Sequence, residues 1–237
     1  ALSWSKLNDF RSCPLKYHWA YELKLKGPPS KNSKVGTLVH EVIENISRHS
    51  SKSLNDETLR KEFEQVLLSN VNQLPILTNE DIEAMHTWLS NWMKREIELL
   101  QSTEITHIEE KIDFEFGEAI FTGKIDRVER DSTGSVTLVD FKASKNESKP
   151  GSSLGDAQLI LYAHAWSQIH GTLPDYVAYD FVRINERVTI KINPTIVQRE
   201  LSNLLGPLSN LISGDTDSNP GFHCSWCDFK SICPDKK

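Results

Sequence analysis

The sequence predicts a mixed α/β fold, in which a sheet is flanked by helices. Residues 1–104 hold stretches with an apolar residue at every third or fourth position, whereas residues 105–143 alternate between apolar and polar. A further helical stretch, two more alternating stretches and a last helix follow. This order of helices, then a strand meander, then helix and strands is typical of a mixed α/β core. With 237 residues, 38% of them hydrophobic, the chain is long enough for one large domain.

The helices are identified by their periodicity and their end signals. Leu7–Leu25 has helical spacing, which Pro14 divides into two pieces. Thr78 and Asp81 have the spacing of a capping box, and Gly171 ends a helix. The other predicted helices are Thr37–Arg48, Glu57–Leu68, Glu80–Leu100, Asp156–His170 and a helix opened by Asn193 and Pro194 that ends near Ile212.

The alternating stretches predict five strands. They are Ile105–Phe116, Ala119–Arg130, Ser135–Ala143, Tyr176–Ile184 and Val188–Ile192. Loops are predicted at Gly27–Ser33 and at residues 144–155, which are rich in Ser, Pro and Gly.

The hairpin between the second and third strands sets the pairing of two acids. Its loop suits a type I turn closed by a left-handed Gly134. With that loop the numbers of facing residues add up to 266, so Asp126 faces Asp140. Asp140 and Lys142 are two apart in one strand and therefore share a face.

Facing acids ~5 Å apart repel each other unless something offsets their charge. Two facing acids with a lysine beside them suit a divalent cation such as Mg²⁺ or Mn²⁺, which takes carboxylate oxygens. Such a site can activate water against a phosphodiester. The alternative from spacing alone is a surface hairpin that carries these charges without a function.

Two further patterns are weak by themselves. His40 closes the segment Gly36–His40 inside a predicted helix, where an ordinary helix histidine is the simpler interpretation. Gln158 and Tyr162 share one face of the helix that follows the site strand. A crossover from that strand would bring Gln158 near Lys142.

The four cysteines give the second strong pattern. Cys13 stands near one end, and Cys224, Cys227 and Cys233 near the other. A disulfide framework does not suit a long chain without an export signal, and a redox Cys-x-x-Cys leaves two cysteines unexplained. Four thiolates suit zinc or an iron–sulfur cluster, and spacing alone leaves both open. Either metal would join the N-terminal helix to the C-terminal tail.

Charge and hydropathy exclude some classes of protein. The net charge of −6 argues against a non-specific DNA coat. No apolar run approaches the ~18 residues of a membrane span, and the N-terminus lacks the apolar core of a signal peptide. We therefore expect an intracellular, cytoplasmic protein without membrane association.

Taken together, the motifs resemble a known family. The patterns G-x-x-x-H, G-x-x-D, D-x-K and Q-x-x-x-Y occur in this order at Gly36–His40, Gly123–Asp126, Asp140–Lys142 and Gln158–Tyr162. With the outer cysteines, the chain resembles the RecB-type nucleases of the PD-(D/E)XK superfamily. Within them it is similar to the iron–sulfur branch, which includes the CRISPR-associated RecB-like exonucleases and the AddB nuclease domain.

The resemblance implies a role for each matching residue. His40, Asp126, Asp140 and the Phe141 carbonyl would bind the catalytic metal, and Lys142 would position or activate the attacking water. Gln158 and Tyr162 would support the site and the DNA. A glutamate is also implied in the preceding strand, where both Glu109 and Glu110 qualify. The cluster ligands would be Cys13, Cys224, Cys227 and Cys233, holding a 4Fe–4S cluster.

The resemblance also implies the fold and the activity. We expect a restriction-endonuclease-like core in one nuclease domain, 1–237, with a helical region 1–104, a core 105–192 and a tail 193–237. The expected activity is that of an Mg²⁺- or Mn²⁺-dependent DNA exonuclease acting on single-stranded ends. One alternative is an end-processing nuclease subunit with helicase, integration or recombination partners, since the sequence has no phosphate-binding loop of a motor. A second alternative is a DNA-binding iron–sulfur scaffold without activity.

Overall fold

The computed structural model describes residues 1–25, 30–49, 53–70, 75–143 and 157–235. By their own contacts the elements form two compact units. Unit 1 comprises Ala1–Pro28, Ile112–Gly123 and Pro194–Lys237, and unit 2 comprises Pro29–Lys111 and Lys124–Asn193. The organisation as one nuclease domain stays a prediction.

Unit 2 begins with three helices, each of which starts at a side-chain cap. The side chains of Ser30, Asn55 and Thr78 accept hydrogen bonds from main-chain N–H groups in the first turns of α3, α4 and α5, and Asp81 completes the predicted capping box. These helices are α3 (Lys31–Ser47), α4 (Asp56–Ser69) and α5 (Asn79–Leu99).

The start of α3 corrects the predicted loop at Gly27–Ser33. Residues 31–33 are helical, because the Ser30 hydroxyl accepts a hydrogen bond from the Ser33 N–H at 3.1 Å and caps the helix there. Residues 26–29 lie outside the described residues. The predicted helix start at Thr37 was therefore wrong by more than a turn.

The sheet confirms the predicted mixed α/β class. Its order is β1-β2-β3-β4-β5, with β3 and β4 parallel and with antiparallel pairing of β2 with β3 and of β4 with β5. A short 3₁₀ turn, Val182–Ile184, ends β4 earlier than predicted. The strands are β1 (Thr103–Phe116), β2 (Ala119–Asp131), β3 (Val136–Lys142), β4 (Tyr176–Phe181) and β5 (Glu186–Lys191).

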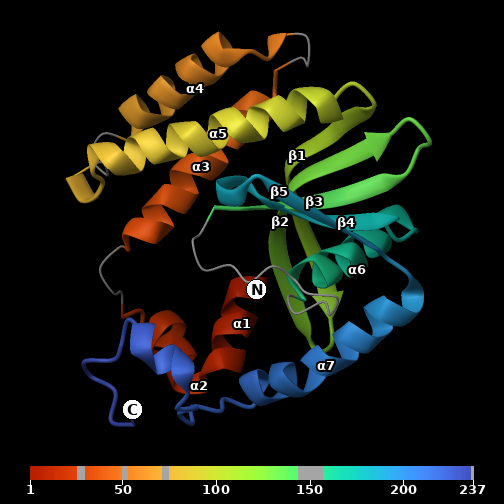
Figure 1. The fold of residues 1–237 in the computed structure, drawn as a ribbon. Coiled ribbons are helices and arrows are strands. Elements are labelled where there is room, and N and C mark those ends of the chain that lie inside the picture. Colours follow the sequence, from red (N-terminus) through yellow and green to blue (C-terminus); the bar gives the residue numbers. More distant parts are fainter. Residues whose placement is uncertain (26–29, 50–52, 71–74, 144–156, 236–237) are drawn as a thin grey trace. The chain divides into compact units, whose positions relative to one another are not determined.

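Within unit 2, helices cover both faces of the sheet (Figure 1). Helix α6 (Gln158–His170) contacts β3 and β4, and Gly171 ends it in the left-handed conformation as predicted. On the other face, α3 and α5 share a core with Val139 and Phe141 of β3. Asp140 and Lys142 alternate with these residues and so belong to the α6 face. The predicted loop at 144–155 lies outside the described residues.

Unit 1 holds both ends of the described chain. Pro14 divides its first helical stretch as predicted, because Cys13 is extended and Pro14 starts a new helix. None of the helices in the described parts of the chain is both long and apolar enough to cross a membrane. The elements of unit 1 are α1 (Trp4–Ser12), α2 (Pro14–Tyr17), the π-helix η1 (His18–Glu22), α7 (Pro194–Ile212) and the 3₁₀ helix η5 (Phe222–Trp226), with the paired ends of β1 and β2.

Two glycines of unit 2 should respond to alanine in opposite ways. Gly134 closes the predicted turn with φ +89°, whereas Gly36 lies inside α3; a Cβ at either position meets no described atom within 4 Å. We expect Gly134→Ala to lower the free energy of unfolding by about 1 kcal/mol, because φ is positive. We expect Gly36→Ala to raise it by about 1 kcal/mol through helix propensity. Urea titration of both variants measures this, and equal effects would contradict it.

Candidate functional site

Strands β2 and β3 pair in the predicted register. Arg127 faces Val139 and Val128 faces Leu138, so the paired numbers add up to 266. Asp126 and Asp140 are the next positions along this register. A hydrogen bond ties the two strands here, because the Phe141 N–H donates to Asp126 Oδ2 at 2.9 Å. The pairing thus brings two carboxylates to the last residues of β3.

Lys142 links Asp140 to α6. Its Nζ lies 2.8 Å from Asp140 Oδ2 and donates to Gln158 Oε1 at 3.1 Å. It also lies 5.7 Å from the centre of the Tyr179 ring on β4. Asp140 is almost fully buried, so the ammonium offsets its charge where water cannot. The β3–α6 crossover therefore brings Gln158 beside Lys142.

Tyr162 lies one turn after Gln158 and is buried. Burial raises the pKa of its hydroxyl, and the charges of Asp140 and Asp126 raise it further, against hydrogen bonds with Gln158 and the Lys124 main chain that lower it. The hydroxyl therefore stays protonated, and it is close enough to both carboxylates to sense them.

His40 reaches the site from α3. Its Nδ1 lies 3.5 Å from Asp126 Oδ2, and its ring meets the Phe141 ring edge to face with centres 6.5 Å apart. The helix motif and the hairpin motif therefore meet in unit 2. The ring is partly exposed, so it lies at the rim of the buried acids.

The predicted metal ligands stay a prediction. Among the described residues, no three His, Cys, Asp or Glu side chains are grouped so that they could hold a metal ion. The two carboxylates have donors within the protein. The Lys142 ammonium binds Asp140, and the Phe141 N–H binds Asp126, so both carboxylates direct an oxygen to a protein donor. The oxygen donors still suit a hard divalent cation chemically.

The structure distinguishes the two glutamates of β1. Glu109 has φ +56° and its carboxylate forms an ion pair with Lys124, which is two residues before Asp126 on β2. A positive φ in a non-glycine residue inside a strand redirects the side chain, as in a β-bulge. Both glutamates qualified from the sequence, which could not reveal this local backbone change.

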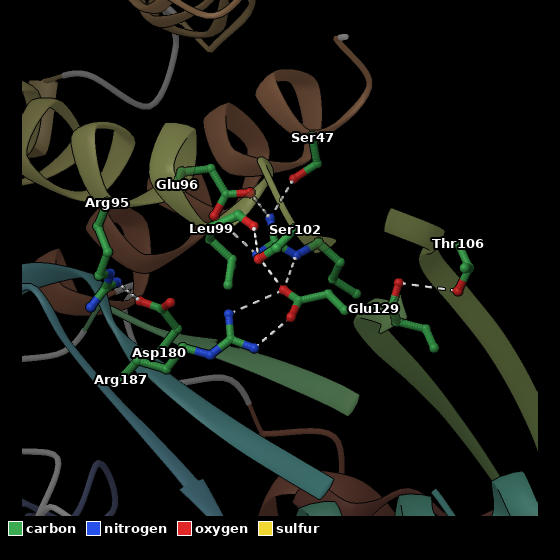
Figure 2. A network of polar contacts seen from close by, with 11 residues as sticks. Ser47, Arg95, Glu96, Leu99, Ser102, Thr106, Glu129, Asp180 and Arg187 are labelled. Carbon is green, nitrogen blue, oxygen red and sulfur yellow. Dashed lines mark hydrogen bonds and ion pairs between the residues drawn. The ribbon is translucent and has the colours of Figure 1, made fainter. Parts of the chain in front are cut away.

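A buried ionic cluster, which the sequence analysis missed, lies on the other face of the sheet (Figure 2). Arg127 is 0% exposed and binds Glu96 of α5 with two hydrogen bonds of 2.6 and 3.0 Å. It also donates to Glu129 at 2.9 and 2.5 Å and to Ser47 at 3.4 Å. In the sequence, this cluster could have been recognised from Arg127 and Glu129, which share one face of a strand whose other residues on that face are mostly apolar.

The cluster extends to the far strands. Arg187 of β5 donates to Glu129 at 3.1 and 2.5 Å, and Arg95 of α5 binds Asp180 of β4. Burial would raise the pKa of Glu129, but Arg127 and Arg187 hold it below its usual value. Burial raises the pKa of Asp180, although Arg95 opposes it. The charges of this layer therefore compensate one another across α5, β2, β4 and β5.

The cluster touches the back of the site strand. The Arg127 guanidinium lies 5.0 Å from the centre of the Phe141 ring, and the Trp92 ring meets Phe141 edge to face at 6.0 Å. Phe141 stands between Asp140 and Lys142 in sequence. Its ring is therefore held on one face while its neighbours form the site on the other.

In unit 1, the four cysteines line one pocket. Lys16, Trp19 and Phe229 are among the other lining residues. All four thiols are free, and main-chain N–H groups reach two of the sulfurs, from Asn219 to Cys13 Sγ at 3.5 Å and from Gly221 to Cys224 Sγ at 3.4 Å. The sulfurs share this pocket, but within the described residues they form no group that could hold a metal.

The aromatic residues near the cysteines divide into two sets. Phe229 is buried and meets Trp19 edge to face with ring centres 5.5 Å apart. Phe222 and Trp226 are 84% and 63% exposed and contact each other. Phe229 lines the pocket together with Trp19, whereas Phe222 and Trp226 are not among its lining residues.

Comparisons with known proteins agree with this fold. A sequence profile of the PD-(D/E)XK nuclease superfamily matches residues 1–234, so the chain belongs to this superfamily. A solved structure of a presumed exonuclease from Eubacterium rectale is similar, with a TM-score of 0.58 and 14% identity, over 90% of this chain and 80% of that chain. The structure of SSO0001 has a TM-score of 0.37 and 15% identity, over 93% of this chain and 94% of that one. No curated protein sequence matches significantly.

The buried cluster predicts an acid-sensitive stability. The pKa of Glu129 is lower in the folded chain than its ordinary value of 4.5, so its contribution is complete above pH 4.5 and is lost as the pH falls through the lower folded value. We expect Glu129→Gln to lower the free energy of unfolding at pH 7 by about 3–5 kcal/mol, because the buried Arg127 and the partly buried Arg187 both lose a partner. It should also flatten the decline below pH 4.5.

Denaturant titrations between pH 3 and pH 7 measure both effects. Glu98→Gln is the matched control, since Glu98 lies on α5 two residues from Glu96 but is exposed. We expect it to leave the stability within about 0.5 kcal/mol. If the free energy of unfolding below pH 4.5 declined equally steeply in Glu129→Gln and in the native sequence, the role of Glu129 would be contradicted.

Proposed function

We propose that this nuclease is a divalent-metal-dependent DNA exonuclease acting on single-stranded ends. The carrying observation is the contact set at the end of β3, in which Asp126, Asp140 and Lys142 meet beside Gln158. The similar structure of a presumed exonuclease is consistent with this proposal. At 14% identity, that similarity supports the fold alone.

Asp126, Asp140, the Phe141 carbonyl and His40 would hold an Mg²⁺ or Mn²⁺ ion. When bound, the ion supplies charge stabilisation at the phosphate and lowers the pKa of a bound water. The chain's own contribution is to hold the two acids in fixed positions. The Phe141 N–H donates to Asp126 and the Lys142 ammonium contacts Asp140, so each carboxylate has a partner in the protein.

Lys142 is the residue best suited to position the attacking water. Its ammonium contacts Asp140 and Gln158. A lysine ammonium is a compact cation with rotatable donors on a flexible stem, so it can turn toward a water or a phosphate oxygen. Tyr162 keeps its proton and can donate to a phosphate oxygen. Gln158 holds Lys142 and therefore acts as a positioning residue.

We further propose that the four cysteines bind a 4Fe–4S cluster in a reducing, cytoplasmic setting. The shared pocket and the four free thiols support this proposal. N–H groups that donate to Cys13 and Cys224 sulfurs are also the kind of contact that tunes such clusters. Helicase, integration or recombination proteins would act as partners that supply DNA ends.

The first test of this function is substitution of the acids and the lysine. We expect Asp126→Ala, Asp140→Ala and Lys142→Ala each to reduce cleavage of end-labelled single-stranded DNA with Mn²⁺ by at least about 10³-fold, because charge at the phosphate is no longer stabilised. Glu104→Gln, at the exposed start of β1, is a matched control and should cleave normally. Retained cleavage by Asp140→Ala would contradict the assignment. Circular dichroism should show that the fold persists.

The second test is the metal content of protein purified without oxygen. We expect brown protein with about four irons per chain, as a 4Fe–4S cluster holds. Cys13→Ala should lose iron at least as completely as Cys224→Ala, because Cys13 is the one proposed ligand that comes from the N-terminal helices. Colourless protein with one zinc per chain would support the zinc alternative and contradict the cluster.

A further inference from the structure

Arg183 differs from most arginines of unit 2 in its partner. Arg48, Arg60, Arg95, Arg127 and Arg187 each form an ion pair with a carboxylate. The Arg183 guanidinium instead lies 4.5 Å from the centre of the Trp88 ring, and no carboxylate of the described residues lies within 4 Å of it. A guanidinium stacked on an aromatic face is held in place while its N–H fork remains able to bind an anion.

The position of Arg183 is the second observation. It lies in the 3₁₀ turn that follows β4, and the parallel pairing of β3 with β4 sets Lys142 beside Phe181, two residues before Arg183. In open α/β sheets, ligands bind outside the carboxyl ends of parallel strands. Arg183 therefore lies just beyond the edge of the sheet at which the proposed active site is located.

Helix α5 carries Trp88, the aromatic partner of Arg183. Trp92 packs on the Phe141 ring, and Trp88 lies four residues earlier, which is about one turn or ~6 Å along the helix. Trp88 and Arg183 are both partly exposed, unlike the fully buried Trp92. The pair therefore lies on the α5 side of the sheet, beyond the end of β4, and is accessible to a polymer that passes this edge.

We propose that Arg183, held by the Trp88 ring, binds a backbone phosphate of the DNA strand whose neighbouring phosphodiester lies at the Asp140–Lys142 site. This proposal rests on the proposed function and names a contact for its substrate. Arginine suits the role because its planar fork can bind two oxygens of one phosphate. Such a contact holds the strand in register without reading its sequence.

The test is binding of a fluorescein-labelled single-stranded oligonucleotide of mixed sequence across a salt series. Protein with Asp140→Ala and without divalent metal is the parent, so that cleavage does not interfere. We expect Arg183→Gln to weaken binding about tenfold at low salt and to reduce the slope of log affinity against log salt by about 0.7, the share of one phosphate contact. Arg183→Lys should retain the slope but bind less tightly, because it keeps the charge and loses the fork.

Arg130→Gln is the matched control. Arg130 also has no carboxylate partner among the described residues, but it pairs with Val136 at the opposite end of β3 and hydrogen-bonds to the Gly134 carbonyl. It should bind DNA as the parent does. Trp88→Leu, which keeps apolar packing, should weaken binding with an unchanged slope, since the charge remains. Should Trp88→Leu fail to fold, the Arg183 variants still decide the question.

Kinetics on the active chain provide a second measurement. We expect Arg183→Gln to raise KM for the oligonucleotide more than it lowers kcat, because the contact positions the strand and not the water. The proposal would be overturned if Arg183→Gln left both the affinity and the salt slope unchanged. It would also be overturned if Arg130→Gln reduced the affinity and the slope by the same amounts as Arg183→Gln. A native chain that binds the oligonucleotide but does not cleave it would contradict the proposed exonuclease and leave the Arg183 contact measurable. A native chain that does not bind it would overturn both.

Discussion

The pairing of β2 with β3 is the constraint on which the candidate site depends. A slip of one residue would move every side chain of a strand to the other face of the sheet. In the observed register, Asp126 accepts a hydrogen bond from the Phe141 N–H, and Arg127 meets Phe141 on the opposite face. One strand segment is thus fixed from both sides. The positions of the two acids and the lysine of the site are set by this segment.

The buried cluster around Arg127 explains how such a segment can be held firmly. A buried ion pair contributes little net stability, because desolvation offsets most of its attraction, but losing one partner is costly. Alternative packings of α5 against the sheet would leave Glu96, Glu129 or Arg127 unpaired and are disfavoured for this reason. The cluster therefore selects one arrangement of the helices behind the site more than it adds to stability.

On the α6 face, a buried charge is likewise paired with an opposite charge. Asp140 is nearly dry and remains next to a cation, Lys142, which Gln158 also holds. A lysine in this position can exchange contacts, since its long side chain is flexible. Glu109 and Lys124 repeat the arrangement nearby, with a strained backbone at Glu109. Local strain of this kind is common near functional sites.

The sequence by itself determined the class of fold, the β2–β3 register and the set of residues at the end of β3, because periodicity, turn chemistry and short spacings are local properties. It also identified the four cysteines that share a pocket. Only the tertiary structure decided the Arg127 cluster, the ion pair of Glu109 with Lys124, and the stacking of Arg183 on Trp88. These depend on contacts between distant residues and on one left-handed backbone position, neither of which leaves a local pattern.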